Sequence, residues 1–187
     1  MILEGLVTTR EADGQPHLAP MGPRFNRANA EQFLLRPFPT SQSYQNLMRH
    51  QEGVMHITDD ALLMARAAIG HISPFPPIHQ AKCIDGFVLD DCCRWYEFRI
   101  IDVDDRDERV RMTASIVHRG RGRDWFGFNR AKHAVVEAAI LATRVHLLPR
   151  EQIEAEFRVL ATIIDKTGEE DEKEALRLLL EHVRGSS

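Results

Sequence analysis

The chain has 187 residues and a mass of 21.4 kDa, which suits one domain or one domain with a helical extension. With 43% hydrophobic and 28% charged residues, it has the composition of a folded globular protein and not of a disordered or fibrous one. The formal net charge of −4 lacks the basic excess that binding to nucleic-acid phosphates requires, and no segment has the pattern of a signal peptide or a membrane span. The sequence therefore predicts neither a nucleic-acid partner nor membrane insertion.

Cysteine usage indicates a reducing environment. The three cysteines are odd in number and two of them are adjacent (Cys83, Cys92 and Cys93), which does not fit a secreted disulfide framework. His71 and His79 share the same proline-broken stretch, but the spacing does not match a zinc site. We therefore expect a cytoplasmic protein with free thiols and no metal.

Short β-rich runs make up the first third of the chain. Residues 2–9 and 17–22 flank Asp13-Gly14, which predicts a hairpin because glycine tolerates the positive φ of a tight turn. Residues 32–36 follow as a third strand. A helix is expected to begin at Thr40 and to end before Gly53.

The middle third continues this alternation. Residues 54–58 predict a strand that runs into Asp59-Asp60, a suitable cap for a helix ending at residue 69. Residues 71–83 hold three prolines and are expected to be irregular and exposed. Residues 95–103 and 109–118 predict two more strands, giving six in total. Strands with inserted helices, followed by helices, indicate an α+β fold with a mainly β core.

An alanine-rich helix follows a loop rich in glycine and arginine, with Asn129 placed to cap it. Arg130, Lys132 and His133 on its first turn could form an anion site, because a helix start offers free N–H groups and positive charge. The alternative is that these cations are solvated and Asn129 only caps. Glu137 is expected to be buried, more readily in a structural ion pair than as an acid or base.

The tail, residues 150–187, reads as two amphipathic helices. Pro149 suits the start of the first helix and Gly168 the break between the two. Ten acidic and six basic residues give this tail a net charge of −4, which we interpret as a solvated face. The sequence thus predicts a barrel or sheet domain over residues 1–128 and a packed helical extension over 129–187.

A second group of hydrogen-bond donors lies near the helix predicted at Thr40. Arg36, Ser41, Ser43 and Asn46 surround its start, and hydroxyls with an arginine at a helix start suit a phosphate. A plain N-cap at Thr40 is the competing interpretation. Thr8, Thr9 and Arg10 at the end of the first strand, together with the two donor clusters, favour a phosphorylated small ligand. Separately, Pro20 indicates an edge or irregular strand whose backbone is free to face a ligand.

Four segments carry a resemblance to a known family: ILEGLVTTREADGQPHLAPMG, RPFPTSQSYQNL, WYEF and, most specifically, FNRAKHAVVEAAI. Together they resemble the domain-of-unknown-function family 447, whose members are similar to FMN-binding split-barrel proteins of the pyridoxamine-phosphate-oxidase type. The resemblance implies a six-stranded split barrel with a C-terminal helical extension, a homodimer and one FMN near the subunit interface. The implied FMN contacts fall among Thr8, Thr9, His17, Ala19, Met21, Arg36, Thr40, Ser41, Ser43, Asn46, Asn129, Arg130 and Lys132.

Two functions follow from the resemblance together with the donor clusters. The first is an FMN-dependent oxidoreductase that acts on a small-molecule substrate, with His17 and His133 as candidates for proton transfer. The alternative is a non-catalytic flavin- or pterin-binding protein linked to one-carbon metabolism. Whether solvent and substrate can reach the reactive edge of the flavin ring distinguishes the two functions.

Overall fold

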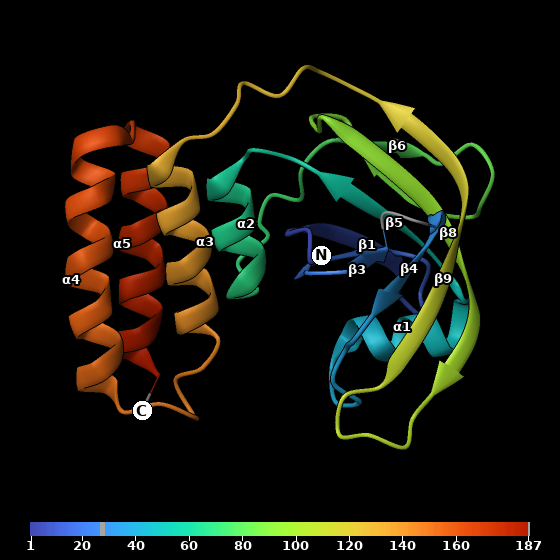
Figure 1. Ribbon diagram of the computed structural model, residues 1–187, viewed down its shortest axis with the longest axis horizontal. Coiled ribbons are helices and arrows are strands. Elements are labelled where there is room, and N and C mark those ends of the chain that lie inside the picture. The colour runs from blue at the N-terminus through green and yellow to red at the C-terminus, as the bar shows by residue number, and fades with distance from the viewer. Residues whose placement is uncertain (27–28, 187) are drawn as a thin grey trace. The chain divides into compact units, whose positions relative to one another are not determined.

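The structure is a computed structural model that describes residues 1–26 and 29–186 (Figure 1). The chain divides into a sheet unit, Met1–Thr58 with Phe75–Asp124, and a helical unit, Asp59–Pro74 with Trp125–Ser187. The division falls after Asp124, and the helical unit also takes the segment at 59–74, which the sequence had assigned to the barrel domain. Packing of the helical extension on the barrel stays a prediction.

The sheet unit is built on one antiparallel seven-stranded sheet. In the order in which neighbours pair, its strands are β2 (Pro16–Met21), β1 (Gly5–Arg10), β5 (Glu52–Ile57), β8 (Arg94–Asp104), β9 (Arg111–Arg121), β4 (Asn29–Leu35) and β3 (Arg24–Asn26). The hairpin of β1 and β2 turns at Gly14, whose φ of 88° explains the glycine. Six of these strands match the predicted runs; β3 was not predicted, so the barrel has one strand more than the six expected.

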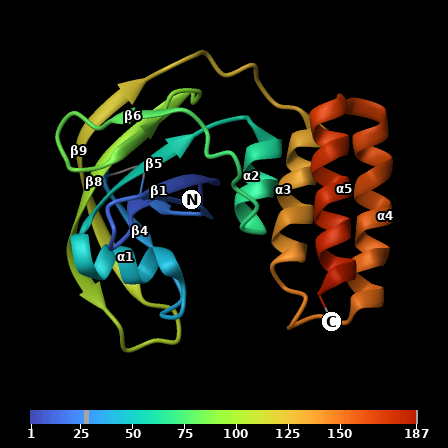
Figure 2. The same ribbon diagram turned by 180° about the vertical axis from the view of Figure 1, so that it is seen from behind.

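The sheet curls on itself because its two edges are joined. β2 and β3 lie at opposite edges, yet only Gly22 and Pro23 separate them in sequence. The residues before β1 bridge to β3: the Leu3 amide donates to the Pro23 carbonyl at 3.1 Å, and the Phe25 amide donates to the Met1 carbonyl at 2.9 Å. The result is the curled sheet that Figures 1 and 2 show from opposite sides.

The two faces of the sheet carry different side chains, because successive residues of a strand point to opposite sides. The inner face holds the main core, which includes Val7, Phe33, Met55, Phe98 and Met112, each at most 3% exposed. The rings of Phe33 and Phe98 meet edge to face, with their centroids 5.2 Å apart. The outer face carries the alternate residues of the same strands, and much of it is covered by the segment between α2 and β8.

This covering segment contains two short strands, β6 (Ile78–Gln80) and β7 (Phe87–Leu89), which pair with each other. We call residues 78–89 the cover segment. The expectation of an irregular, exposed stretch over residues 71–83 holds only up to residue 77, because β6 begins at Ile78. Ile84 and Val88 of the cover segment are buried against Val54.

The helical unit contains four helices: α2 (Ala61–Ala68), α3 (Arg130–Ala142), α4 (Arg150–Thr167) and α5 (Glu170–Gly185), seen together in Figure 2. As predicted, Asp60 caps α2, Asn129 caps α3 and Gly168 ends α4. The small buried residues of α3, among them Ala134 and Ala138, allow the neighbouring helices to approach closely. Glu137 is exposed, so the prediction of a buried carboxylate on α3 was wrong; this helix has one solvated side.

Within the described residues, no helix is long and apolar enough to cross a membrane. In the same part of the chain, no group of histidine, cysteine or acidic side chains could hold a metal ion. The three cysteines are free thiols; Cys83 is exposed, and Cys92 and Cys93 are buried. Burial raises the pKa of Cys92 to about 12, with smaller contributions from Cys93 and Asp91.

Candidate functional site

The predicted contact residues fall into two sets. The set from Thr8 to Asn46 belongs to the sheet unit, and Asn129, Arg130 and Lys132 belong to the helical unit. Helix α1 (Gln42–His50), which the sequence predicts from Thr40, carries the last two residues of the first set. Its N-cap is Ser41 and not Thr40, because the Ser41 hydroxyl accepts a hydrogen bond from the Tyr44 amide.

Thr8 and Thr9 point to opposite faces of β1, so they cannot both contact one ligand through their side chains. Thr9 faces inward and its hydroxyl accepts from the Asn46 side chain at 3.0 Å. Thr8 faces outward and its hydroxyl donates to the Phe87 carbonyl at 2.5 Å. Thr8, Thr9, Ser43 and Asn46 are all at most 2% exposed. The two threonines and Asn46 therefore hold α1 and the cover segment on the sheet.

Two further buried side chains bind the cover segment through its backbone. The Glu97 carboxylate accepts from the amides of Lys82, at 2.9 Å, and Cys83, at 2.6 Å. His56 lies between the Leu6 carbonyl and the Leu89 amide, each 3.1 Å from a ring nitrogen. Burial is the largest cause of the low pKa of His56, which falls to about 4. The outer face over β1, β5 and β8 is thus occupied by the chain itself.

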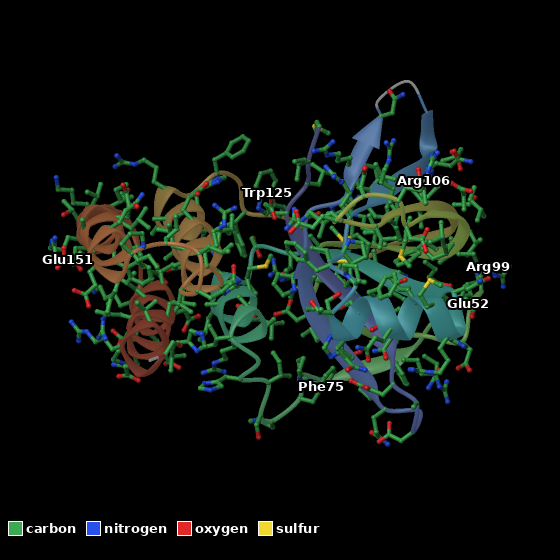
Figure 3. The ribbon with its side chains drawn as sticks, turned by 90° about the horizontal axis from the view of Figure 1, so that it is seen from below. Glu52, Phe75, Arg99, Arg106, Trp125 and Glu151 are labelled. Carbon is green, nitrogen blue, oxygen red and sulfur yellow. The ribbon has the colours of Figure 1, made fainter. Side chains whose placement is uncertain are left out.

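The cover segment is also held at its rim by charged groups. Glu52 accepts from the Asp85 amide and pairs with Arg99, whose Nε lies 2.8 Å from the carboxylate. Figure 3 shows Glu52 and Arg99 side by side. Arg10 pairs with Asp85. The Glu52 pKa is lowered because hydrogen bonds from Arg99 and Asp85 outweigh its burial, the largest single contribution, which acts in the opposite direction.

The edge strand β2 carries three predicted contacts on one face: His17, Ala19 and Met21. They stand opposite Thr9, Val7 and Gly5 of β1, so this face is the inner one. His17 lies 3.4 Å from Glu11, and its pKa is lowered because burial outweighs the attraction of that carboxylate. As predicted from Pro20, β2 is an edge strand.

Arg36 is the predicted contact with an unsatisfied donor. It follows directly on β4 and precedes α1, and its Nε atom is buried without a hydrogen-bond acceptor among the described residues. A buried donor without an acceptor costs roughly 1–3 kcal/mol. Thr40, four residues further along the chain, is exposed, and the first turn of α1 holds no acidic residue. This end of β4 therefore has unused capacity to bind an anion.

A shallow hollow of about 210 Å³ lies against β3, β4 and β9. Leu34 forms part of it, and continuing the alternation of β4 places Arg36 on the side of Gln32 and Leu34. The other residues that line it are Arg24, Asn26, Gln32, Phe33 and Thr113. None of these residues is among the predicted contacts, because β3 was not predicted and nothing local marks these polar residues as neighbours.

At the start of α3, most of the predicted anion site is occupied by the protein itself. The Asn129 side chain accepts from the amides of Ala131 and Lys132 and donates to the Thr167 carbonyl. Lys132 Nζ lies 2.6 Å from the Asp59 carbonyl oxygen and 3.5 Å from the Glu172 carboxylate. Arg130 is exposed on this turn.

Comparison with solved structures shows the fold. An FMN-bound protein of the DUF447 family from Methanosarcina mazei, MM1853, has a TM-score of 0.85 at 22% identity, over 97% of this chain and 94% of that one. The 2-nitrobenzoate 2-nitroreductase NbaA of Pseudomonas fluorescens has a TM-score of 0.54 at 16% identity, over 64% of each chain.

A third solved structure, an FMN-binding protein of Thermus thermophilus with bound p-hydroxybenzaldehyde, has a TM-score of 0.56 at 11% identity, over 65% of this chain and 72% of that one. These likenesses confirm the predicted α+β split-barrel fold. A search of curated proteins gives no match.

Two family models cover most of the chain. The N-terminal domain of a protein of unknown function, DUF447, matches residues 3–123, and a second model of the same family matches residues 129–181. The resemblance noted from the sequence is confirmed, and the chain belongs to the DUF447 family.

Proposed function

We propose that this protein binds FMN and uses it in the oxidation or reduction of a small molecule. The observation that carries the proposal is the buried, unsatisfied Nε of Arg36 at the end of β4, in a fold shared with FMN-bound and FMN-binding proteins. A flavin phosphate has the negatively charged acceptors that this arginine lacks.

The residues around Arg36 fit the phosphate end of FMN. The start of α1 adds the positive end of its dipole and the amides of its first turn other than that of Tyr44, which Ser41 caps, and no acidic residue lies on this turn. The Thr40 hydroxyl is exposed and free to turn toward the same group. Arg36 and the segment at 40–43 would therefore hold the phosphate.

The hollow at β3, β4 and β9, on the side of the sheet to which Arg36 is assigned, fits the other end of the ligand. Leu34 offers apolar surface against which a flat ring can lie, and Arg24, Gln32 and Thr113 offer polar groups at its margin. FMN supplies the capacity to accept or donate a hydride or single electrons, while the protein positions the ring and limits access to it. Met21, at the end of β2, is half-buried and packs against the core on the inner face of the sheet.

A homodimer is part of this proposal. The hollow measures about 210 Å³, below the roughly 300–1,000 Å³ of typical small-molecule sites. Additional surface would be needed to enclose a flavin, and a second copy of the chain is the simplest source of it.

The test is FMN titration of the flavin-free protein, followed by visible absorbance and by retention of the flavin in gel filtration. R36Q should weaken FMN binding by about tenfold or more, because a hydrogen bond to a charged group contributes roughly 1.5–3 kcal/mol. The matched control is R106Q: Arg106 belongs to the same unit, is strongly exposed and pairs with Asp104, two residues away. No FMN binding by the wild type, or equal affinity in R36Q and the wild type, would contradict the proposal.

A further inference from the structure

Three aromatic side chains stand in solvent in the helical unit, just before α3. Trp125 is 50% exposed, Phe126 92% and Phe128 86%. We call these three residues the aromatic cluster. Single exposed aromatics are common, but three within four residues form an apolar patch of the kind that marks a binding surface.

The cluster is ordered by contacts among its own rings. Trp125 and Phe128 meet edge to face at 5.1 Å between centroids and an interplanar angle of 81°. His133, one turn into α3, stacks on Phe128 at 5.9 Å and 28°. These are preferred arrangements of aromatic pairs, so Trp125, Phe128 and His133 present their rings in a defined array.

The backbone on both sides of the cluster is anchored within the same unit. The Phe126 amide donates to the Asp59 carboxylate at 3.4 Å, and Asn129 caps α3. Gly127 lies between, with a φ of 112° and no atom near the position of a Cβ. Figure 3 labels Trp125 at the start of this segment. A surface fixed before binding loses little entropy when a ligand arrives.

Positive charge lies next to the cluster. Arg130 is exposed on the first turn of α3, where the helix dipole adds positive potential and no acidic residue is present. Lys132 adds little, because it is paired with Glu172. The guanidinium of Arg130 is suited to bind a carboxylate through two parallel hydrogen bonds.

We propose that the aromatic cluster, with His133 and Arg130, binds a planar aromatic carboxylate: the rings stack on the aromatic part and Arg130 binds the carboxylate. This site lies wholly within the helical unit, so the inference goes beyond the proposed flavin function and does not depend on it. A second copy of this chain is the competing occupant of exposed rings, and the concentration dependence described below distinguishes it.

The experiment is a fluorescence titration with 2-nitrobenzoate as the probe. The chain has two tryptophans, and Trp95 is half-buried in the sheet unit. Saturable quenching is expected in the wild type and should be lost in W125F. R130Q should weaken binding of 2-nitrobenzoate by about tenfold or more and leave binding of uncharged nitrobenzene unchanged. R158Q, a charge change at an exposed position on α4, should bind like the wild type.

Three results would overturn the inference. One is saturable quenching that persists in W125F; a second is equal affinity in R130Q and the wild type. The third is a Trp125 emission that shifts with protein concentration in the absence of the probe, which would show that a second copy covers the cluster. FMN binding is measured separately through R36Q. If FMN binds and 2-nitrobenzoate does not, only this inference fails. If 2-nitrobenzoate binds and FMN does not, the cluster remains a ligand site and the proposed flavin function fails.

Discussion

His56 illustrates at the scale of one residue how a buried side chain fixes its own protonation state. The Leu6 carbonyl can only accept a hydrogen bond, so Nδ1 must carry the proton. The Leu89 amide can only donate one, so Nε2 must be unprotonated. Adding a proton to Nε2 would place two donors against each other in a buried setting. The neutral ring is thus the form that the fold stabilises, in agreement with its low pKa of about 4.

This gives a pH-dependent stability. A histidine with a pKa of 6.5 in the unfolded chain and about 4 in the fold contributes full stability above pH 6.5, which is lost as the pH falls toward 4. The free energy of unfolding should fall by about 3 kcal/mol across that window from this residue alone. Urea unfolding at a series of pH values measures it.

H56Q should flatten that part of the pH dependence, while H133Q, which changes an exposed histidine, should preserve it. A wild-type curve parallel to that of H56Q between pH 7 and pH 5 would show that His56 is not the titrating group.

Residue-level predictions succeeded where the signal is local. Gly14, Asp60 and Asn129 act within three residues of themselves, so turn and cap chemistry is visible in the sequence. Lys132 shows the limit: its ammonium bonds the Asp59 carbonyl, 73 positions away. No sequence spacing indicates that this cation, a candidate for an anion site, is already engaged.

At the scale of elements, the cover segment is the part that sequence reasoning misjudged most. Its strands β6 and β7 are three residues each, and its buried bonds reach residues far away in the chain, such as Thr8. Alternation over so few residues gives no usable pattern, and prolines at 74, 76 and 77 suggest a loop. The long strands β8 and β9, in contrast, were predicted because eleven residues leave room for several β-branched and aromatic residues.

Glu97 should be the strongest single support of this element. In E97Q one carboxylate oxygen becomes an NH₂ group that faces a backbone amide, so one buried donor loses its acceptor. We expect a loss of roughly 1–3 kcal/mol in the free energy of unfolding and faster proteolysis within residues 78–89. Denaturant unfolding and limited proteolysis with mass spectrometry measure the two effects.

The control for this substitution is E31Q, because Glu31 pairs with Arg119 on the surface, where ion pairs contribute little. If E97Q and E31Q proved equally stable and equally resistant to protease, the role assigned to Glu97 would be wrong.

At the scale of the whole molecule, the sequence anticipated a β-rich part followed by helices, and the two units keep that order apart from α2. The helix α2 joins α3 and α5 through contacts such as the Arg66–Glu174 pair, which spans 108 positions. The family, the fold and the runs of six strands could be predicted. The hollow at β3 and the membership of α2 could not, since both depend on which distant elements meet.

The proposed homodimer is tested by sedimentation velocity at micromolar concentration. The expected mass is twice 21.4 kDa, with or without FMN. F126S and F128S should sediment as dimers too, because the aromatic cluster is assigned to a ligand and not to the subunit contact. If the wild type is a monomer, the proposal that two copies together enclose the FMN is wrong. If only F126S and F128S are monomers, the aromatic cluster forms the subunit contact.

The bonds that hold the cover segment have an evolutionary consequence. Thr8, His56 and Glu97 bind carbonyls and amides, which every amino acid except proline supplies in full. The exposed residues within 78–89 can therefore change their side chains through descent while following the same path, whereas the three supporting side chains and the buried Ile84 and Val88 cannot change freely. Among homologues we expect the exposed side chains of residues 78–89 to vary while Thr8, His56 and Glu97 are conserved. A lineage could then change one surface of the barrel without changing the sheet that supports it.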